Sequence, residues 1–64
     1  MQVTAIIGDK EFNVRAVFVT PKIARWAVKN LGATSGRVIG PAKYKHQTVC
    51  YEVDGDKVRR SVLP

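Results

Sequence analysis

Hydrophobic and polar residues alternate along the first third of the chain. Apolar residues occupy every second position between residues 11 and 19, namely Phe12, Val14, Ala16 and Phe18. A period of two is typical of a strand with one buried face. Residues 2–7 repeat the pattern more weakly, and Gly8-Asp9-Lys10 between the two segments has turn chemistry. The pattern predicts an antiparallel hairpin with a turn of three or four residues.

Residues 20–32 follow a helical period instead. Thr20 suits the N-cap, Pro21 the first helical position, and Gly32 a left-handed residue after the last turn. On a helical wheel one face is apolar and the opposite face is basic. The apolar face holds Ile23, Ala24, Ala27, Val28 and Leu31; the basic face holds Lys22, Arg25 and Lys29, with Trp26 at the border. We expect this amphipathic helix to pack on the first hairpin, against Phe12, Val14 and Phe18.

The second half of the chain contains an irregular part and a second hairpin. Glycines and Pro41 interrupt residues 33–45, where only 37–39 is expected as a short strand. Residues 47–53 and 57–63 flank Asp54-Gly55, which predicts a two-residue hairpin loop. That register sets Glu52 opposite Lys57 and Tyr51 opposite Val58. One face then holds Val49, Tyr51, Val53, Val58, Val62 and Arg60, and the other holds Cys50 and Arg59.

These elements predict a single α+β domain over residues 1–64. Its antiparallel sheet has four or five strands with one amphipathic helix on one face, in the order β-β-α-(β)-β-β. The chain has 64 residues, close to the lower limit for unaided folding, so a homodimer is left open. We find no repeat or linker, and expect a complete small protein.

Charge narrows the class of partner. Eleven Lys and Arg against five Asp and Glu give a net charge of +6. Such an excess favours a polyanion, either nucleic acid or an acidic protein surface, although charge can also serve solubility alone. A lone Cys50, the absence of a signal-peptide pattern and the absence of a long apolar run predict a soluble cytoplasmic protein without membrane contact.

The basic residues fall into three groups, on the helix, in the irregular middle and on the last strand. Cations that share a surface can bind phosphates, and aromatic residues beside them can stack on bases. For Trp26 itself, packing at the edge of the core is the preferred interpretation. The candidate binding residues are Lys22, Arg25, Trp26, Lys29, Arg37, Lys43, Tyr44, Lys45, His46, Arg59 and Arg60.

Catalytic and metal chemistry are not expected. His46 and Cys50 would stand about 13 Å apart in an extended strand, too far for proton transfer. One Cys and one His do not provide the four ligands of a structural zinc site. Asp54-Gly55-Asp56 lacks the other positions of a calcium loop, and turn formation explains it better. We therefore predict no cofactor and no enzymatic activity.

Two functions remain in competition. The first is a non-enzymatic module that binds nucleic acid through Lys/Arg–phosphate contacts. The second is a small, phage-like modulator or inhibitor that binds an acidic surface of a host protein, or that pairs a strand edge with a partner's sheet. The first predicts binding that weakens steeply with salt. The second predicts tight 1:1 binding to one protein and weak binding to generic DNA.

Overall fold

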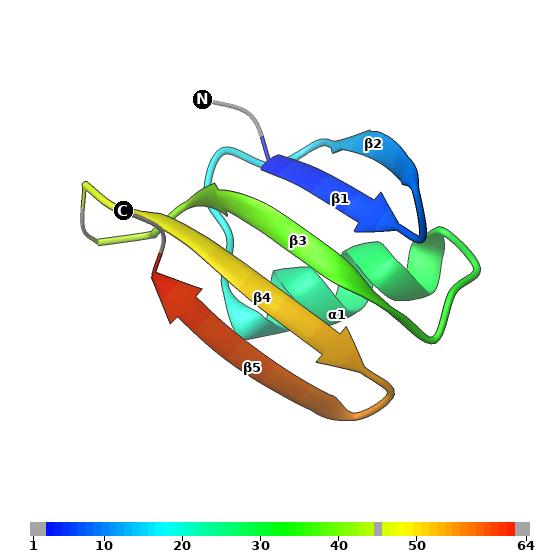
Figure 1. The fold of residues 1–64 in the computed structure, drawn as a ribbon. Coiled ribbons are helices and arrows are strands. Elements are labelled where there is room, and N and C mark those ends of the chain that lie inside the picture. The colour runs from blue at the N-terminus through cyan, green and yellow to red at the C-terminus, as the bar shows by residue number, and fades with distance from the viewer. Residues whose placement is uncertain (1–2, 45, 63–64) are drawn as a thin grey trace.

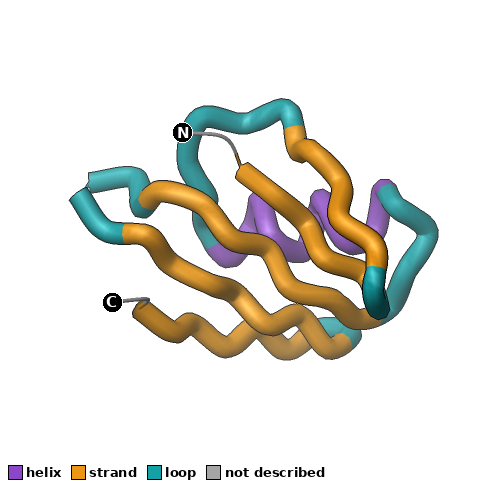
Figure 2. Tube along the Cα trace, turned by 45° about the horizontal axis from the view of Figure 1, so that its top comes forward, coloured by secondary structure: helices purple, strands orange, loops and turns teal. Residues whose placement is uncertain are grey.

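Five antiparallel strands form one sheet, and a single helix covers one of its faces (Figure 1). The computed structural model describes residues 3–44 and 46–62. The elements are β1 (Val3–Ile7), β2 (Lys10–Val14), α1 (Pro21–Asn30), β3 (Ser35–Pro41), β4 (Thr48–Asp54) and β5 (Lys57–Val62). The strand order is β2-β1-β3-β4-β5. The predicted α+β class is confirmed, with five strands, and within the described residues the second face of the sheet carries no covering element (Figure 2).

The capping residues of α1 are as predicted. The Thr20 hydroxyl oxygen accepts a hydrogen bond from the Ile23 N–H at 3.2 Å, and Pro21 occupies the first helical position. After the last turn Gly32 has φ +75°. Its N–H donates to the carbonyl of Lys29, and the Ala33 N–H donates to the carbonyl of Val28. This Schellman arrangement satisfies the free carbonyls at the helix end, so the chain can turn directly into β3.

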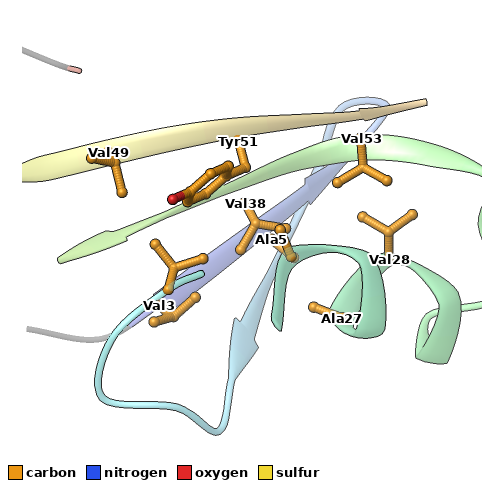
Figure 3. Packing of buried hydrophobic residues seen from close by; sticks show 10 residues of the cluster. Val3, Ala5, Ala27, Val28, Val38, Val49, Tyr51 and Val53 are labelled. Carbon is orange, nitrogen blue, oxygen red and sulfur yellow. The ribbon is translucent and has the colours of Figure 1, made fainter. Parts of the chain in front are cut away.

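The predicted packing of α1 on the first hairpin is confirmed for β1 and Val14 but is wrong for Phe12 and Phe18, which do not belong to the core. The helix lies mainly over β3, β4 and β5, with β1 at its side. Its buried residues are Ala24, Ala27 and Val28. The core they enter consists mostly of valine and alanine, joined by Tyr51 (Figure 3). The β2 residue Phe12 is 36% exposed, because β2 is the edge strand farthest from the strands that the helix covers.

The irregular middle segment is a central strand. β3 runs from Ser35 to Pro41 and pairs with both β1 and β4. Gly36 and Gly40, interpreted as interruptions, instead allow close packing. A Cβ on Gly36 would collide with Cδ1 of Ile7, and a Cβ on Gly40 would stand 2.8 Å from Cγ2 of Val3. Both glycines lie on the helix-covered face, on either side of Val38. At these two positions a side chain would have no room.

The second predicted strand is shorter than its alternation suggested. β2 ends at Val14, and the Ala16 N–H donates to the Val14 carbonyl at 2.8 Å in a tight turn. The residues after this turn leave the sheet. The Val19 N–H then bonds to the Pro41 carbonyl at 2.9 Å, which fixes residues 15–20 beside the β3–β4 loop.

Both hairpins close through a Gly-Asp pair. Lys10 pairs with Ile7 around Gly8-Asp9, and Lys57 pairs with Asp54 around Gly55-Asp56. The predicted Asp54-Gly55 loop and the three- or four-residue first turn are therefore wrong. Each glycine has positive φ and each aspartate does not, which fits a turn with glycine at its first central position.

The corrected register keeps the predicted faces of the second hairpin. Glu52 lies opposite Arg59 and Tyr51 opposite Arg60, a shift of two residues from the predicted pairs. Because side chains alternate with a period of two, such a shift leaves every residue on its own face. Val49, Tyr51 and Val53 accordingly point to the helix and are buried.

Filling the space at Gly36 will destabilise the protein. We expect Gly36→Ala to lower the free energy of unfolding by about 1–3 kcal/mol through overpacking. The Ile7→Val change removes the Cδ1 atom nearest the new methyl group, so in its background the penalty will shrink by at least about 0.5 kcal/mol. Urea unfolding of the four proteins in this double-mutant cycle measures both effects. Additive penalties would contradict the close approach of β3 to Ile7.

Candidate nucleic-acid interface

The acidic residues lie at one end and on one face of the molecule. β1 and β4 are both antiparallel to β3, so their C-terminal turns lie at the same end of the sheet, as Figure 1 shows. Asp9, Asp54 and Asp56 lie at this turn end. Glu11 and Glu52 belong to the uncovered face of the sheet, in a cross-strand row with Arg37. The outer face of α1 and the opposite end of the sheet therefore contain none of the five acids.

The outer face of α1 carries three cations and an exposed indole. Lys22, Arg25 and Lys29 are exposed, and Trp26 among them is 53% exposed. The prediction that Trp26 packs at the edge of the core is wrong: it is not a member of the core cluster. Buried positions of α1 are occupied by small residues, and the indole projects from the other side of the helix. A groove of about 440 Å³ runs between this helix and the β4–β5 turn, with Asp56 at its border.

The end of the sheet opposite the acidic turns holds a second basic and aromatic group. We call it the loop end; it consists of residues 15–20, 42–44 and 46–47. Nζ of Lys43 lies 5.4 Å from the ring centre of Phe18 and 5.1 Å from that of Tyr44. These are cation–π distances, and they hold the lysine between two aromatic rings. Tyr44 is 85% exposed, and His46 lines a hollow of about 390 Å³ beside it.

The loop end is continuous with the helix face. Phe18 precedes Thr20, the N-cap of α1, by two residues, and Lys22 lies in the first helical turn. That turn contains no acidic residue, so the partial positive charge of the helix N-terminus adds to that of Lys22. Among the described candidates, Lys22, Arg25, Trp26, Lys29, Lys43, Tyr44 and His46 lie on the acid-poor side of the molecule. Lys45 lies outside the described residues.

The remaining arginines do not join this surface. Arg37 was assigned to a basic loop, but it stands on β3, on the uncovered face, and its Nε lies 3.9 Å from Oε1 of Glu52. Arg59 is on the same face, opposite Glu52. Glu52 is thus the cross-strand neighbour of both arginines, and its carboxylate lies within ion-pair distance of Arg37. Arg60, the next residue, points to the other side of β5, so the predicted last-strand group is divided between two faces.

Cys50 is a buried thiol at the centre of the uncovered face. Burial raises the pKa of the Cys50 thiol; Arg37 opposes this effect and Glu52 adds to it. A raised pKa keeps the sulfur protonated near neutral pH, which makes it a poor nucleophile. His46 belongs to the loop before β4 rather than to the strand.

Sequence reasoning missed three residues at the edge of this surface. Phe18 was assigned to the buried face of a strand, although it contacts Lys43 at the loop end. Arg15 was interpreted as the polar side of the same strand, and Leu31 as a core residue. Arg15 and Leu31 instead line a hollow between α1 and β2 together with Trp26. Only the position of the helix on the sheet determines this grouping.

Comparisons with known proteins show no match: no family model, curated protein or solved structure resembles the chain. Among the described residues, no group of three or more His, Cys, Asp and Glu side chains could hold a metal ion. Within residues 3–44 and 46–62 the structure has no helix that is long and apolar enough to cross a bilayer. The geometry of the surface is therefore the basis for a functional assignment.

The cations around Trp26 will attract anionic quenchers. We expect iodide to quench the fluorescence of this single tryptophan more strongly than caesium does, because Lys22, Arg25 and Lys29 surround the indole. The difference should shrink as inert salt screens the charges, and Lys22→Gln/Lys29→Gln should reduce it. Stern–Volmer titrations measure the effect. Equal quenching by the two ions at low salt would contradict a positive potential at Trp26.

The raised pKa of Cys50 gives a second test. The rate of iodoacetamide alkylation should reach half its maximum at a higher pH in the folded protein than in the urea-unfolded chain, because the folded thiol loses its proton later. Arg37→Gln should raise the midpoint further, and Glu52→Gln should lower it. A folded midpoint at or below the unfolded one would show that burial does not control the thiol.

Proposed function

We propose that this protein is a small, basic, non-enzymatic module that binds nucleic acid through Lys/Arg–phosphate contacts. The observation that carries the proposal is the separation of charge. The outer face of α1 and the loop end present cations and exposed aromatic rings, whereas the acids occupy the turn end and the uncovered sheet face. A polyanion that approaches the helix therefore meets attraction with little opposing repulsion.

The spacing of the helix cations suits a phosphate backbone. Lys22 and Lys29 are seven residues apart, which corresponds to about 10 Å along the helix axis. Successive phosphates of one duplex strand advance by about 3.4 Å along the DNA axis. The three cations of α1 thus span a length that exceeds the spacing of neighbouring phosphates, and Lys43 at the loop end extends the charged surface beyond the N-terminus of the helix.

A salt series with matched charge variants tests the proposal. Binding to short single- and double-stranded DNA should weaken steeply as salt rises. Lys22→Gln/Arg25→Gln/Lys29→Gln should flatten the log–log slope by roughly 2–3, since each lost phosphate contact removes about 0.7–0.9. Fluorescence anisotropy of labelled oligonucleotides measures affinity and slope. The control, Arg37→Gln/Lys57→Gln/Arg59→Gln, removes the same charge from the uncovered face and the adjacent turn, and should change the slope much less.

Two outcomes would contradict the proposal. Equal loss in both triple variants would mean that net charge, and not this surface, governs binding. Absence of binding to either form of DNA and to RNA at low salt would remove the nucleic-acid role altogether.

The second candidate is a modulator that binds an acidic protein surface. It is supported by the edge strand β2, which pairs only with β1 and leaves Phe12 exposed beside the basic helix. An edge of this kind can accept a strand from another sheet. Tight 1:1 binding to one protein, lost in the helix triple variant and combined with weak DNA binding, would favour this function over the first.

A further inference from the structure

A hollow of about 140 Å³ lies between α1 and the edge strand β2. It exists because the helix packs over the other strands and leaves the inner side of β2 uncovered. Val14, Ala27 and Leu31 supply its apolar lining, and Trp26 stands at its edge. Trp26 and Leu31 are 53% and 38% exposed, so their apolar surfaces face solvent in a protein whose core is otherwise closed.

Polar groups border the same hollow. Asn30 lines it, and its Nδ2 donates to the Trp26 carbonyl at 2.7 Å. That bond uses one amide hydrogen and leaves the second hydrogen and the carbonyl oxygen for another partner. Arg15 also lines the hollow, and Lys22 and Lys29 stand one helical turn from Trp26 on either side. An indole, an amide and one guanidinium group thus meet around a small apolar space, and two lysines flank the indole on the outer face of the helix.

We propose that this hollow receives one unstacked base of a single-stranded nucleic acid. The base stacks on Trp26 above Leu31 and Val14, its edge meets the Asn30 amide, and Arg15 contacts an adjacent phosphate. Stacking on an aromatic side chain needs a free base face, which a duplex does not offer, so the site selects single strands. An acidic peptide would also meet the cations, but the small volume suits one planar ring better than a run of side chains. This inference rests on the proposed function and specifies its substrate class.

The decisive comparison separates the base from the phosphate. A short oligothymidylate and an oligomer of equal length built of abasic sites carry the same backbone charge. We expect the oligothymidylate to bind roughly five- to hundredfold more tightly, which is the range for one stacked base, and to quench Trp26 fluorescence on binding. The abasic oligomer should bind without quenching. Oligouridylate and oligothymidylate together show whether RNA and DNA share the site.

Variants then locate the site. Trp26→Leu keeps an apolar side chain on an exposed helix position and should remove the preference for oligothymidylate over the abasic oligomer. Phe12→Leu, at another exposed aromatic on the same side of β2 but outside the hollow, should retain it. Arg15→Gln should lower the salt slope by roughly 0.7. Circular dichroism and urea unfolding confirm that each variant is folded.

Failure of the base site and failure of the proposed function give different results. Equal affinity for the two oligomers without Trp26 quenching would overturn the base site and leave phosphate binding intact. Loss of the preference in Phe12→Leu but not in Trp26→Leu would overturn its location. Absence of binding to both oligomers and to duplex DNA would overturn the proposed function as well. Quenching by a polyglutamate peptide alone would overturn the base site in favour of an acidic protein partner.

Discussion

The close packing of α1 on the centre of the sheet determines most of the molecule. The helix presents Ala24, Ala27 and Val28 to strands that carry glycine and valine, so backbone approaches backbone without large side chains between them. A core of this kind excludes aromatic rings: among the described residues Tyr51 is its one aromatic member. Trp26, Phe12 and Tyr44 are consequently left with exposed faces. A small protein that leaves most of its aromatic surface outside its core has that surface available for a partner.

The same packing separates the charges. Apolar residues on one side of α1 require the cations to occupy the other, while the short Gly-Asp turns place three acids at the turn end of the sheet, where Asp56 borders the groove beside the helix. On the uncovered face, cross-strand pairing places Glu11 and Glu52 in one row with Arg37 and Arg59, so two acids balance two arginines there. The net charge of +6 is therefore not spread evenly. Its unbalanced part lies on the helix and the loop end, where attraction to a polyanion would act.

The position of the helix also explains the hollow beside β2. One helix of ten residues is too narrow to cover five strands, and it lies mainly over β3, β4 and β5. β2 remains attached to β1 by hydrogen bonds but leaves Phe12 exposed and only partly buries Val14. The uncovered strip borders the basic face of the helix, so apolar and cationic surfaces meet along a single edge. That meeting of surfaces is the basis for both the proposed function and the proposed base site.

Sequence signals were sufficient to predict the elements whose causes are local. The helix was predicted from Thr20, Pro21 and Gly32, which act within one turn of their own positions. The period-two alternation of the second hairpin assigned its residues to the correct faces, although the predicted register was wrong by two residues. The position of a hairpin loop depends on which residues adopt positive φ. Asp54 and Gly55 can both do so, and therefore the sequence did not decide which two residues form the loop. The assignment of Gly36 and Gly40 to a central strand depends on contacts with Ile7 and Val3, which lie 29 and 37 residues away in the chain, so it required the folded structure. The ion pair of Arg37 with Glu52 and the exposure of Trp26 among cations also required the folded structure. Both depend on which strands are neighbours and on which of them the helix covers.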